Sequence, residues 1–212
     1  MNSRTIILAV ATALVAVLSA SVLVPSESYA FSQDGFEYEP LTEGTVAVVG
    51  YTGDATEVTV PSQVEYEGVT YNVVAANGTF EGNETVESIV FPDTVRLVDE
   101  YALDGCSALK AVVFPGTIEV ISGVMFNGCS SLVSVEVAGG DRYVSSDGVV
   151  YNGDMTELVY FPAGVAGTFT VPDTVESIGR AAFSGTHLTS VDIADVARMW
   201  VRSRSSGAAC PR

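Results

Sequence analysis

The sequence has few basic residues, and their scarcity restricts the kinds of partner that it can bind. Its 212 residues include 9 Lys and Arg against 26 Asp and Glu, so the formal net charge is −17. A surface of this sign is repelled by phosphate backbones and by anionic lipid headgroups. The composition therefore argues against nucleic acid and against an electrostatically bound membrane surface as partners.

Histidine and cysteine are also scarce. The chain has one histidine, His187, and three cysteines, Cys106, Cys129 and Cys210. A His-rich metal site or a dense disulfide framework needs more of these residues than the chain contains. The sequence also lacks a calcium loop, because no run of its acidic residues has the alternating ligand spacing of an EF-hand.

The single histidine lacks the surroundings of a catalytic base. Ser184, Ser190 and Asp192 are near His187 in sequence, but no nucleophile-elbow motif accompanies them. We interpret His187 as a solvent-exposed loop residue. The sequence therefore predicts a protein that is not an enzyme, with no catalytic residue, no metal ligand and no cofactor.

Charged residues make up only 17% of the chain and hydrophobic residues 48%, which predicts a folded protein and not a disordered acidic one.

The N-terminal segment 1–30 has the pattern of a secretory signal peptide. Arg4 is followed by an apolar run from Ile6 to Val24, and Ser28-Tyr29-Ala30 supplies small residues for cleavage after Ala30. The alternative is an uncleaved anchor, since a membrane span needs about 20 apolar residues.

An internal repeat follows the predicted signal. Each copy opens with a proline, continues to a large apolar residue placed two positions before a glycine, and ends in Leu-x-x-Val-x followed by an apolar residue. Full copies begin at Pro92, Pro115 and Pro172, and a degenerate earlier copy begins at Pro61. The interval from Pro92 to Pro115 gives the length of one regular copy.

A unit of this length cannot bury its apolar side alone, so the repeat predicts a solenoid of stacked coils. The Leu-x-x-Val segment of each coil should be a short strand that pairs in parallel with the next coil at about 4.8 Å. The apolar spacing after each proline suits a helical turn that ends at the large apolar residue. Gly105, Gly128 and Gly185 then require a turn with positive φ or no Cβ.

Stacking of the strands aligns their outward residues in columns. Ser88, Ala111, Ser134 and Ser190 are expected in one column, and Val90, Val113, Glu136 and Asp192 in the next. Small side chains at these positions predict a flat sheet face. The candidate protein-contact residues are Ser88, Val90, Lys110, Val113, Ser134, Glu136, Ser190 and Asp192.

The repeats resemble the BspA-type leucine-rich repeats of bacterial surface proteins. The resemblance covers roughly residues 61–194 and rests on the Pro-Asp-Thr-Val, Gly-Cys and Leu-x-x-Val elements. It implies a leucine-rich repeat solenoid with a β-strand and a short helical turn in each coil of about 23 residues. Segments 146–151 and 158–164 look like the hairpin that interrupts such arrays. Leu103 and Thr186 depart from the usual Phe and Cys.

The predicted organisation has four parts. Residues 1–30 form the signal peptide, residues 31–73 an N-terminal β-hairpin cap, and residues 74–194 the repeat array with a β-hairpin insert at about 139–171. Short alternating runs separated by glycines predict the hairpins of the cap. Residues 195–212 carry four of the nine basic residues and are interpreted as an irregular, truncated or altered tail, with a folded cap as the alternative.

Cys106 and Cys129 occupy the same slot of adjacent coils. The resemblance implies that this slot holds an inward residue that contacts backbone groups in the turn, which favours buried free thiols. A disulfide and a metal site are the alternatives, because stacked Cα atoms would lie within disulfide reach. Cys210 would be the odd thiol of an exported protein.

The resemblance implies adhesion to host matrix proteins or to the surface proteins of other bacteria. We therefore expect a secreted or cell-surface, non-enzymatic protein that binds proteins, without a membrane span once the signal is removed. The alternative is a structural spacer, or a remnant of a larger adhesin with no ligand of its own.

Overall fold

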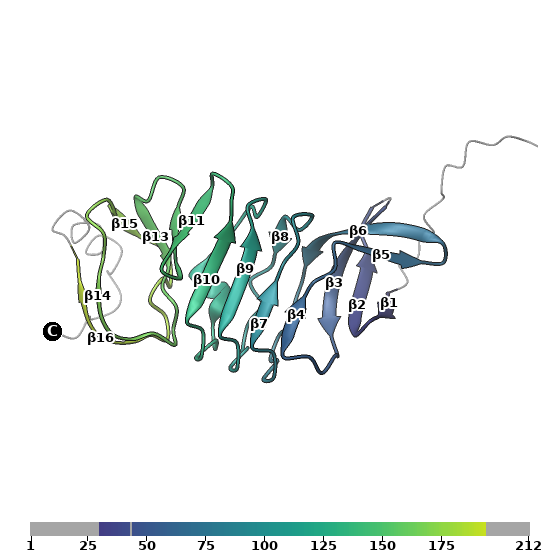
Figure 1. Ribbon diagram of the computed structural model, residues 1–212, viewed down its shortest axis with the longest axis horizontal. Helices are drawn as coiled ribbons and strands as arrows, with labels where there is room; N and C mark the ends of the chain where they lie inside the picture. The colour runs from purple at the N-terminus through teal and green to yellow at the C-terminus, as the bar shows by residue number, and fades with distance from the viewer. Residues whose placement is uncertain (1–29, 43, 194–212) are drawn as a thin grey trace, which may run out of the picture.

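The computed structural model describes residues 30–42 and 44–193, and Figure 1 shows an elongated stack of coils along one axis. The predicted signal segment apart from Ala30, the predicted tail and Cys210 lie outside these residues. No helix in the described part of the chain is long and apolar enough to cross a membrane.

The repeated Leu-x-x-Val segments form a parallel sheet, as the spacing predicts. Its strands are β4 (Glu57–Thr59), β7 (Ser88–Val90), β9 (Ala111–Pro115) and β10 (Ser134–Ala138). The central inward residues Ile89, Val112 and Val135 are aligned across the strands and fully buried. One apolar column therefore joins neighbouring coils, which explains why a single coil cannot fold alone.

The opposite limb of each coil returns the chain to the sheet, and it contains less helix than predicted. Only one described coil has a helix, the 3-10 helix η1 (Gly123–Phe126). The first full coil instead forms β8 (Leu97–Val98), which pairs in parallel with β6 (Val69–Ala76), and the last forms β15 (Ser177–Ile178). An extended limb followed by a tight turn buries residues at the same spacing as a helix, so the pattern did not separate the two.

The turn glycines adopt the conformation that the sequence predicts. Gly105 and Gly128 have φ values of +75°, and Gly185 has a φ of +71°. A Cβ on Gly128 would lie 2.8 Å from the Cα of Gly105 in the coil before it. Glycine is required here for close stacking of the coils as well as for the positive φ.

The N-terminal region consists of short strands and hairpins. The strand β2 (Phe36–Pro40) pairs in antiparallel fashion with both β1 (Phe31–Gln33) and β3 (Thr45–Tyr51), and β3 pairs in parallel with β6. A second hairpin joins β5 (Gln63–Tyr66) to β6. Stacked rings such as Phe31 and Tyr38, 5.1 Å apart, fill the space beneath these strands.

A hairpin interrupts the coils near the middle of the array. It is formed by β11 (Tyr143–Ser146) and β12 (Val149–Asn152), and β12 continues into the antiparallel strand β13 (Glu157–Tyr160). The hairpin turn lies against the outer edge of β10, where the Val135 N–H donates to the Gly148 carbonyl at 3.0 Å.

This hairpin separates the four-stranded parallel sheet from the strands of the last coils. The strands β14 (Ala166–Thr170) and β16 (His187–Asp192) form a separate parallel sheet, in which Ser190 lies opposite Thr168 and Asp192 opposite Thr170. The expectation that Ser190 and Asp192 extend the columns of β7, β9 and β10 is therefore wrong. The inserted turn occupies the edge of β10 that a further strand would need.

Candidate protein-binding surface

The outward residues of the four-stranded parallel sheet form the surface that we call the sheet face. Pairing of the strands aligns these residues in two columns. The first column is Glu57, Ser88, Ala111 and Ser134, and the second is Thr59, Val90, Val113 and Glu136.

The sheet face presents small or β-branched side chains on a rigid backbone. Val90 is 38% exposed at the centre of the second column, and Val113 beside it is partly buried. Ordering such short side chains at an interface costs little conformational entropy. The surface is therefore suited to contact with another protein, with carboxylates of Glu57 and Glu136 at its two ends.

A third column lies just before the strands. The backbone N–H of Lys110 donates to the Glu87 carbonyl at 2.7 Å, and the N–H of Val133 donates to the Lys110 carbonyl at 2.9 Å. The Lys110 ammonium forms an ion pair with Glu87 at 2.7 Å, and about half of each side chain is exposed. Lys110 therefore adds a matched charge and Val133, 48% exposed, adds an apolar group to the margin of the sheet face.

The structure brings together six of the eight residues proposed from sequence. Ser88, Val90, Val113, Ser134 and Glu136 lie on the sheet face, and Lys110 lies at its margin. Ser190 and Asp192 lie on β16, beyond the inserted hairpin. The predicted contact surface is therefore shorter than the repeat array.

The cysteines of adjacent coils lie in the core and form a ladder of sulfur hydrogen bonds. The Cys106 thiol donates to the Phe80 carbonyl at 3.0 Å, and the Cys129 thiol donates to the Leu103 carbonyl at 3.1 Å. Both cysteines are free in the structure. Contact with the Cys106 thiol, and then burial, raises the pKa of Cys129. This environment disfavours the Cys129 thiolate, which is the form that a nucleophile or a metal ligand must take.

The histidine lies at the exposed start of a strand. His187 begins β16, where it is exposed, and its Nδ1 lies 3.1 Å from the Ala163 carbonyl. Among residues 30–42 and 44–193, no group of His, Cys, Asp and Glu side chains is arranged to hold a metal ion.

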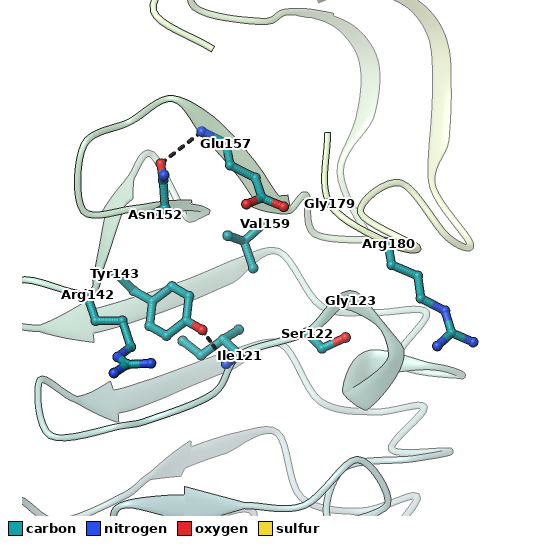
Figure 2. A pocket seen from close by; sticks show the side chains of 10 residues that line it. All are labelled: Ile121, Ser122, Gly123, Arg142, Tyr143, Asn152, Glu157, Val159, Gly179 and Arg180. Atoms are coloured by element: carbon teal, nitrogen blue, oxygen red, sulfur yellow. Dashed lines mark hydrogen bonds between the residues drawn. The ribbon is translucent and has the colours of Figure 1, made fainter. Parts of the chain in front are cut away.

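Sequence reasoning missed a cleft of about 330 Å³ on the return limb. Figure 2 shows it beside the inserted hairpin, with Arg142 and Arg180 flanking it and Tyr143 and Val159 between them. A signal for it exists in the repeat spacing. The interval from Pro115 to Pro172 is longer than two regular copies require, and the surplus forms the hairpin that opens the cleft.

Solved structures similar to this chain are leucine-rich repeat proteins of bacteria. One from Bacteroides ovatus is 26% identical, with a TM-score of 0.53 over 77% of this chain and 41% of its own. The T. pallidum leucine-rich repeat protein is 22% identical, with a TM-score of 0.51 over 77% of this chain and 71% of its own. A leucine-rich cell-surface protein of Faecalibacterium prausnitzii is 22% identical, with a TM-score of 0.49 over 81% of this chain and 44% of its own.

The chain therefore spans less than half the length of two of these three structures. No curated protein matches its sequence significantly. The model of the BspA-type leucine-rich repeat region, in six copies, matches residues 70–166 and 159–199. These matches cover more than half of the sequence, so the chain belongs to the BspA-type leucine-rich repeat family.

Proposed function

We propose that this protein is exported to the bacterial cell surface and binds other proteins there through the sheet face, as a non-enzymatic adhesion module. The observation that carries the proposal is the alignment of small and β-branched side chains in columns on a rigid parallel sheet. Repeat solenoids use such extended regular surfaces for protein binding. Host matrix proteins and the surface proteins of other bacteria are the proposed partners, in keeping with the family.

The export step rests on the N-terminal sequence. Arg4, the apolar run from Ile6 to Val24 and the small residues before Phe31 are the features of a cleaved signal. N-terminal sequencing of protein recovered from the cell surface or medium is expected to begin at Phe31. A chain that retains Met1 in the membrane fraction would support the anchor alternative.

Binding of the purified protein to a panel of matrix proteins and whole bacterial cells, at physiological salt, tests the adhesion step. A cooperative thermal melt first establishes that the protein is folded. We expect saturable binding to at least one member of the panel. The alternative function, a structural spacer without its own ligand, predicts a folded protein that binds none of them.

A matched pair of substitutions tests the surface that is used. Val90→Lys places a long charged side chain at the centre of the sheet face, whereas Leu97→Lys places the same side chain on the return limb, where Leu97 is 50% exposed. We expect Val90→Lys to weaken binding about tenfold or more, which corresponds to about 1.4 kcal/mol. Equal losses from both variants would contradict binding through the sheet face.

A further inference from the structure

At the cleft, the hydrogen-bond ladder that joins the return limbs of adjacent coils is interrupted. In the earlier coils, the Val74 carbonyl accepts from the Arg96 N–H and the Arg96 carbonyl accepts from the Glu119 N–H, each at 2.9 Å. In the last coil, the Thr156 carbonyl accepts from the Glu176 N–H at 2.7 Å. The corresponding carbonyl of Glu119 receives no backbone donor from the following coil in this ladder.

Side chains replace the missing backbone partners. Arg142 Nη1 donates to the Glu119 carbonyl at 3.1 Å, and the Ile121 N–H donates to the Tyr143 hydroxyl at 3.1 Å. Both side chains come from the start of the inserted hairpin, which diverts the chain away from the limb. The backbone of segment 119–121, which lies outside the assigned strands, is therefore partnered on this side by two side chains and not by another coil.

The cleft beside this edge has room for a short extended segment. Its volume of about 330 Å³ is near the lower end of the range for ligand sites, about 300–1,000 Å³. Ile121, Val159 and the Tyr143 ring give it apolar walls, as Figure 2 shows. The Glu157 carboxylate and the Ser122 hydroxyl supply acceptors at its margin.

The charge of the cleft differs from that of the rest of the molecule. The part of the chain that the structure describes contains four basic residues. Arg96 is paired with Glu119 and Lys110 with Glu87. The remaining two, Arg142 and Arg180, both line the cleft, and neither forms an ion pair with a carboxylate of the described residues. With the Glu157 carboxylate, the cleft has two guanidinium groups and one carboxylate among its lining residues, which is a local excess of positive charge in a chain of net charge −17.

We propose that this cleft binds an extended segment of a partner protein that carries an acidic side chain. The segment pairs in extended form with the backbone of residues 119–121. One of its N–H groups donates to the Glu119 carbonyl, and one of its carbonyls accepts from the Ile121 N–H. The guanidinium of Arg142, released from Glu119, and that of Arg180 pair with the carboxylate of the segment. Main-chain pairing provides affinity in such strand addition, and the side-chain contacts provide specificity.

The site is separate from the sheet face, so it is a second interaction surface and not a part of the first. A blocked peptide of sequence Ser-Val-Glu-Val-Glu-Val-Ser, titrated into the purified protein, probes it directly. NMR chemical shifts report the position of binding, and we expect the Ile121 amide and the Tyr143 ring signals to move with a saturable dependence on peptide concentration. Two matched peptides, one with Gln for both Glu residues and one with N-methylated backbone, test the two parts of the recognition.

A pair of substitutions that each remove one positive charge distinguishes the cleft from general attraction to an acidic peptide. Arg180 is exposed, and Arg180→Gln removes a guanidinium of the cleft without disturbing the core. Lys110→Gln removes the same charge at the margin of the sheet face. We expect Arg180→Gln to weaken peptide binding about tenfold, as for the loss of a charge-assisted hydrogen bond, and Lys110→Gln to change it less than about twofold.

Several results would overturn the proposal. These are the absence of a saturable shift at the Ile121 amide, equal losses from Arg180→Gln and Lys110→Gln, and binding of the N-methylated peptide as tight as that of the parent. Free glutamate that binds as tightly as the peptide would reduce the cleft to an anion site. A uronic-acid oligosaccharide that binds more tightly would assign it to carbohydrate. None of these outcomes depends on the sheet face, so its binding to matrix proteins is judged independently.

Discussion

At the scale of single residues, the large apolar residue two positions before the turn glycine of each coil, here called the aromatic slot, joins the sheet to the return limb. Phe126 is buried, and its ring stacks on Tyr160 with centroids 4.1 Å apart, while Phe114 from the sheet side lies 6.2 Å from it. Phe126 therefore connects the sheet, the return limb and the inserted strand β13. Leu103 fills the same slot in the preceding coil and is also fully buried, so its departure from the family pattern keeps the register.

We expect Phe126→Ala to destabilise the protein by about 3–5 kcal/mol, because it removes a buried ring and leaves a cavity beside Tyr160. Chemical denaturation measures the change in the free energy of unfolding. Val120→Ala is the control, since an exposed truncation on the same coil should change that free energy by less than about 0.5 kcal/mol. A loss below about 1 kcal/mol for Phe126→Ala would contradict this role.

Buried tyrosines make stability sensitive to alkaline pH. Burial, and then the charge of Asp34, raises the pKa of Tyr38 to about 12, above its ordinary value of 10. The folded state therefore favours the protonated phenol. This contribution to stability is fully present below pH about 10 and is lost as the pH rises from about 10 to about 12.

Denaturation midpoints measured from pH 8 to pH 12 are expected to fall above about pH 10. Tyr38→Phe removes the ionisable group but keeps the ring, so its midpoints should fall less steeply over the same interval. Tyr101→Phe is the control, because Tyr101 is exposed at 54%. A Tyr38→Phe profile parallel to that of the unsubstituted protein would contradict the assignment.

At the scale of secondary-structure elements, the β5–β6 hairpin and the inserted β11–β12 hairpin differ in what lies beneath their turns. Glu67-Gly68 and Asp147-Gly148 have the same backbone conformation, with φ values of 51° and 78° in each turn. A Cβ on Gly68 would meet nothing within 4 Å, whereas a Cβ on Gly148 would lie 3.0 Å from Ser134 Cα and from the Val133 carbonyl oxygen. The turn of the inserted hairpin therefore packs against β10. A Cβ at the turn of the β5–β6 hairpin would have no such neighbour.

The difference between Gly148→Ala and Gly68→Ala isolates this packing. Both substitutions place a Cβ at positive φ, which costs about 1–3 kcal/mol. Only Gly148→Ala also pushes the turn away from β10, so it should cost more and should weaken the bond from the Val135 N–H to the Gly148 carbonyl. Hydrogen exchange of the Val135 amide is the measurement. Equal exchange rates in the two variants would show that the turn does not protect β10.

The sequence predicts elements well where one apolar period determines one geometry. The columns of β7, β9 and β10 follow from the Leu-x-x-Val spacing, and the positive φ of Gly105 and Gly128 follows from their place after the aromatic slot. The helical turn of each coil was overpredicted because Val95, Val98 and Ala102 are buried by an extended limb and a turn. The long interval from Pro115 to Pro172 indicates an insertion, but the cleft also depends on where the inserted hairpin leaves the stack, and the repeat spacing does not specify that place.

At the scale of the whole molecule, the inserted hairpin divides the core into two clusters. The first extends from the N-terminal strands to Val135 and Val159, and the second contains Val149, Leu158, Phe161 and the coils after them. The second cluster is smaller, and many of its members are only partly buried, among them Phe169, Phe183, Leu188 and Val191. Less apolar area is therefore removed from water there, and the strands β14 and β16 have less stabilisation than β7, β9 and β10.

We expect the second cluster to open before the first under mild denaturant, because solenoid stability is a sum of coil and neighbour contributions. Native-state hydrogen exchange measures this directly, and the amides of β14 and β16 should exchange with a lower free energy of opening than those of β9. Two buried valines provide the matched test. Val175→Ala should lower the opening free energy of β14 and β16 by about 0.5–3 kcal/mol and leave that of β9 nearly unchanged, whereas Val112→Ala should lower that of β9. Identical changes at all three strands would show that the hairpin joins the two clusters into one cooperative unit.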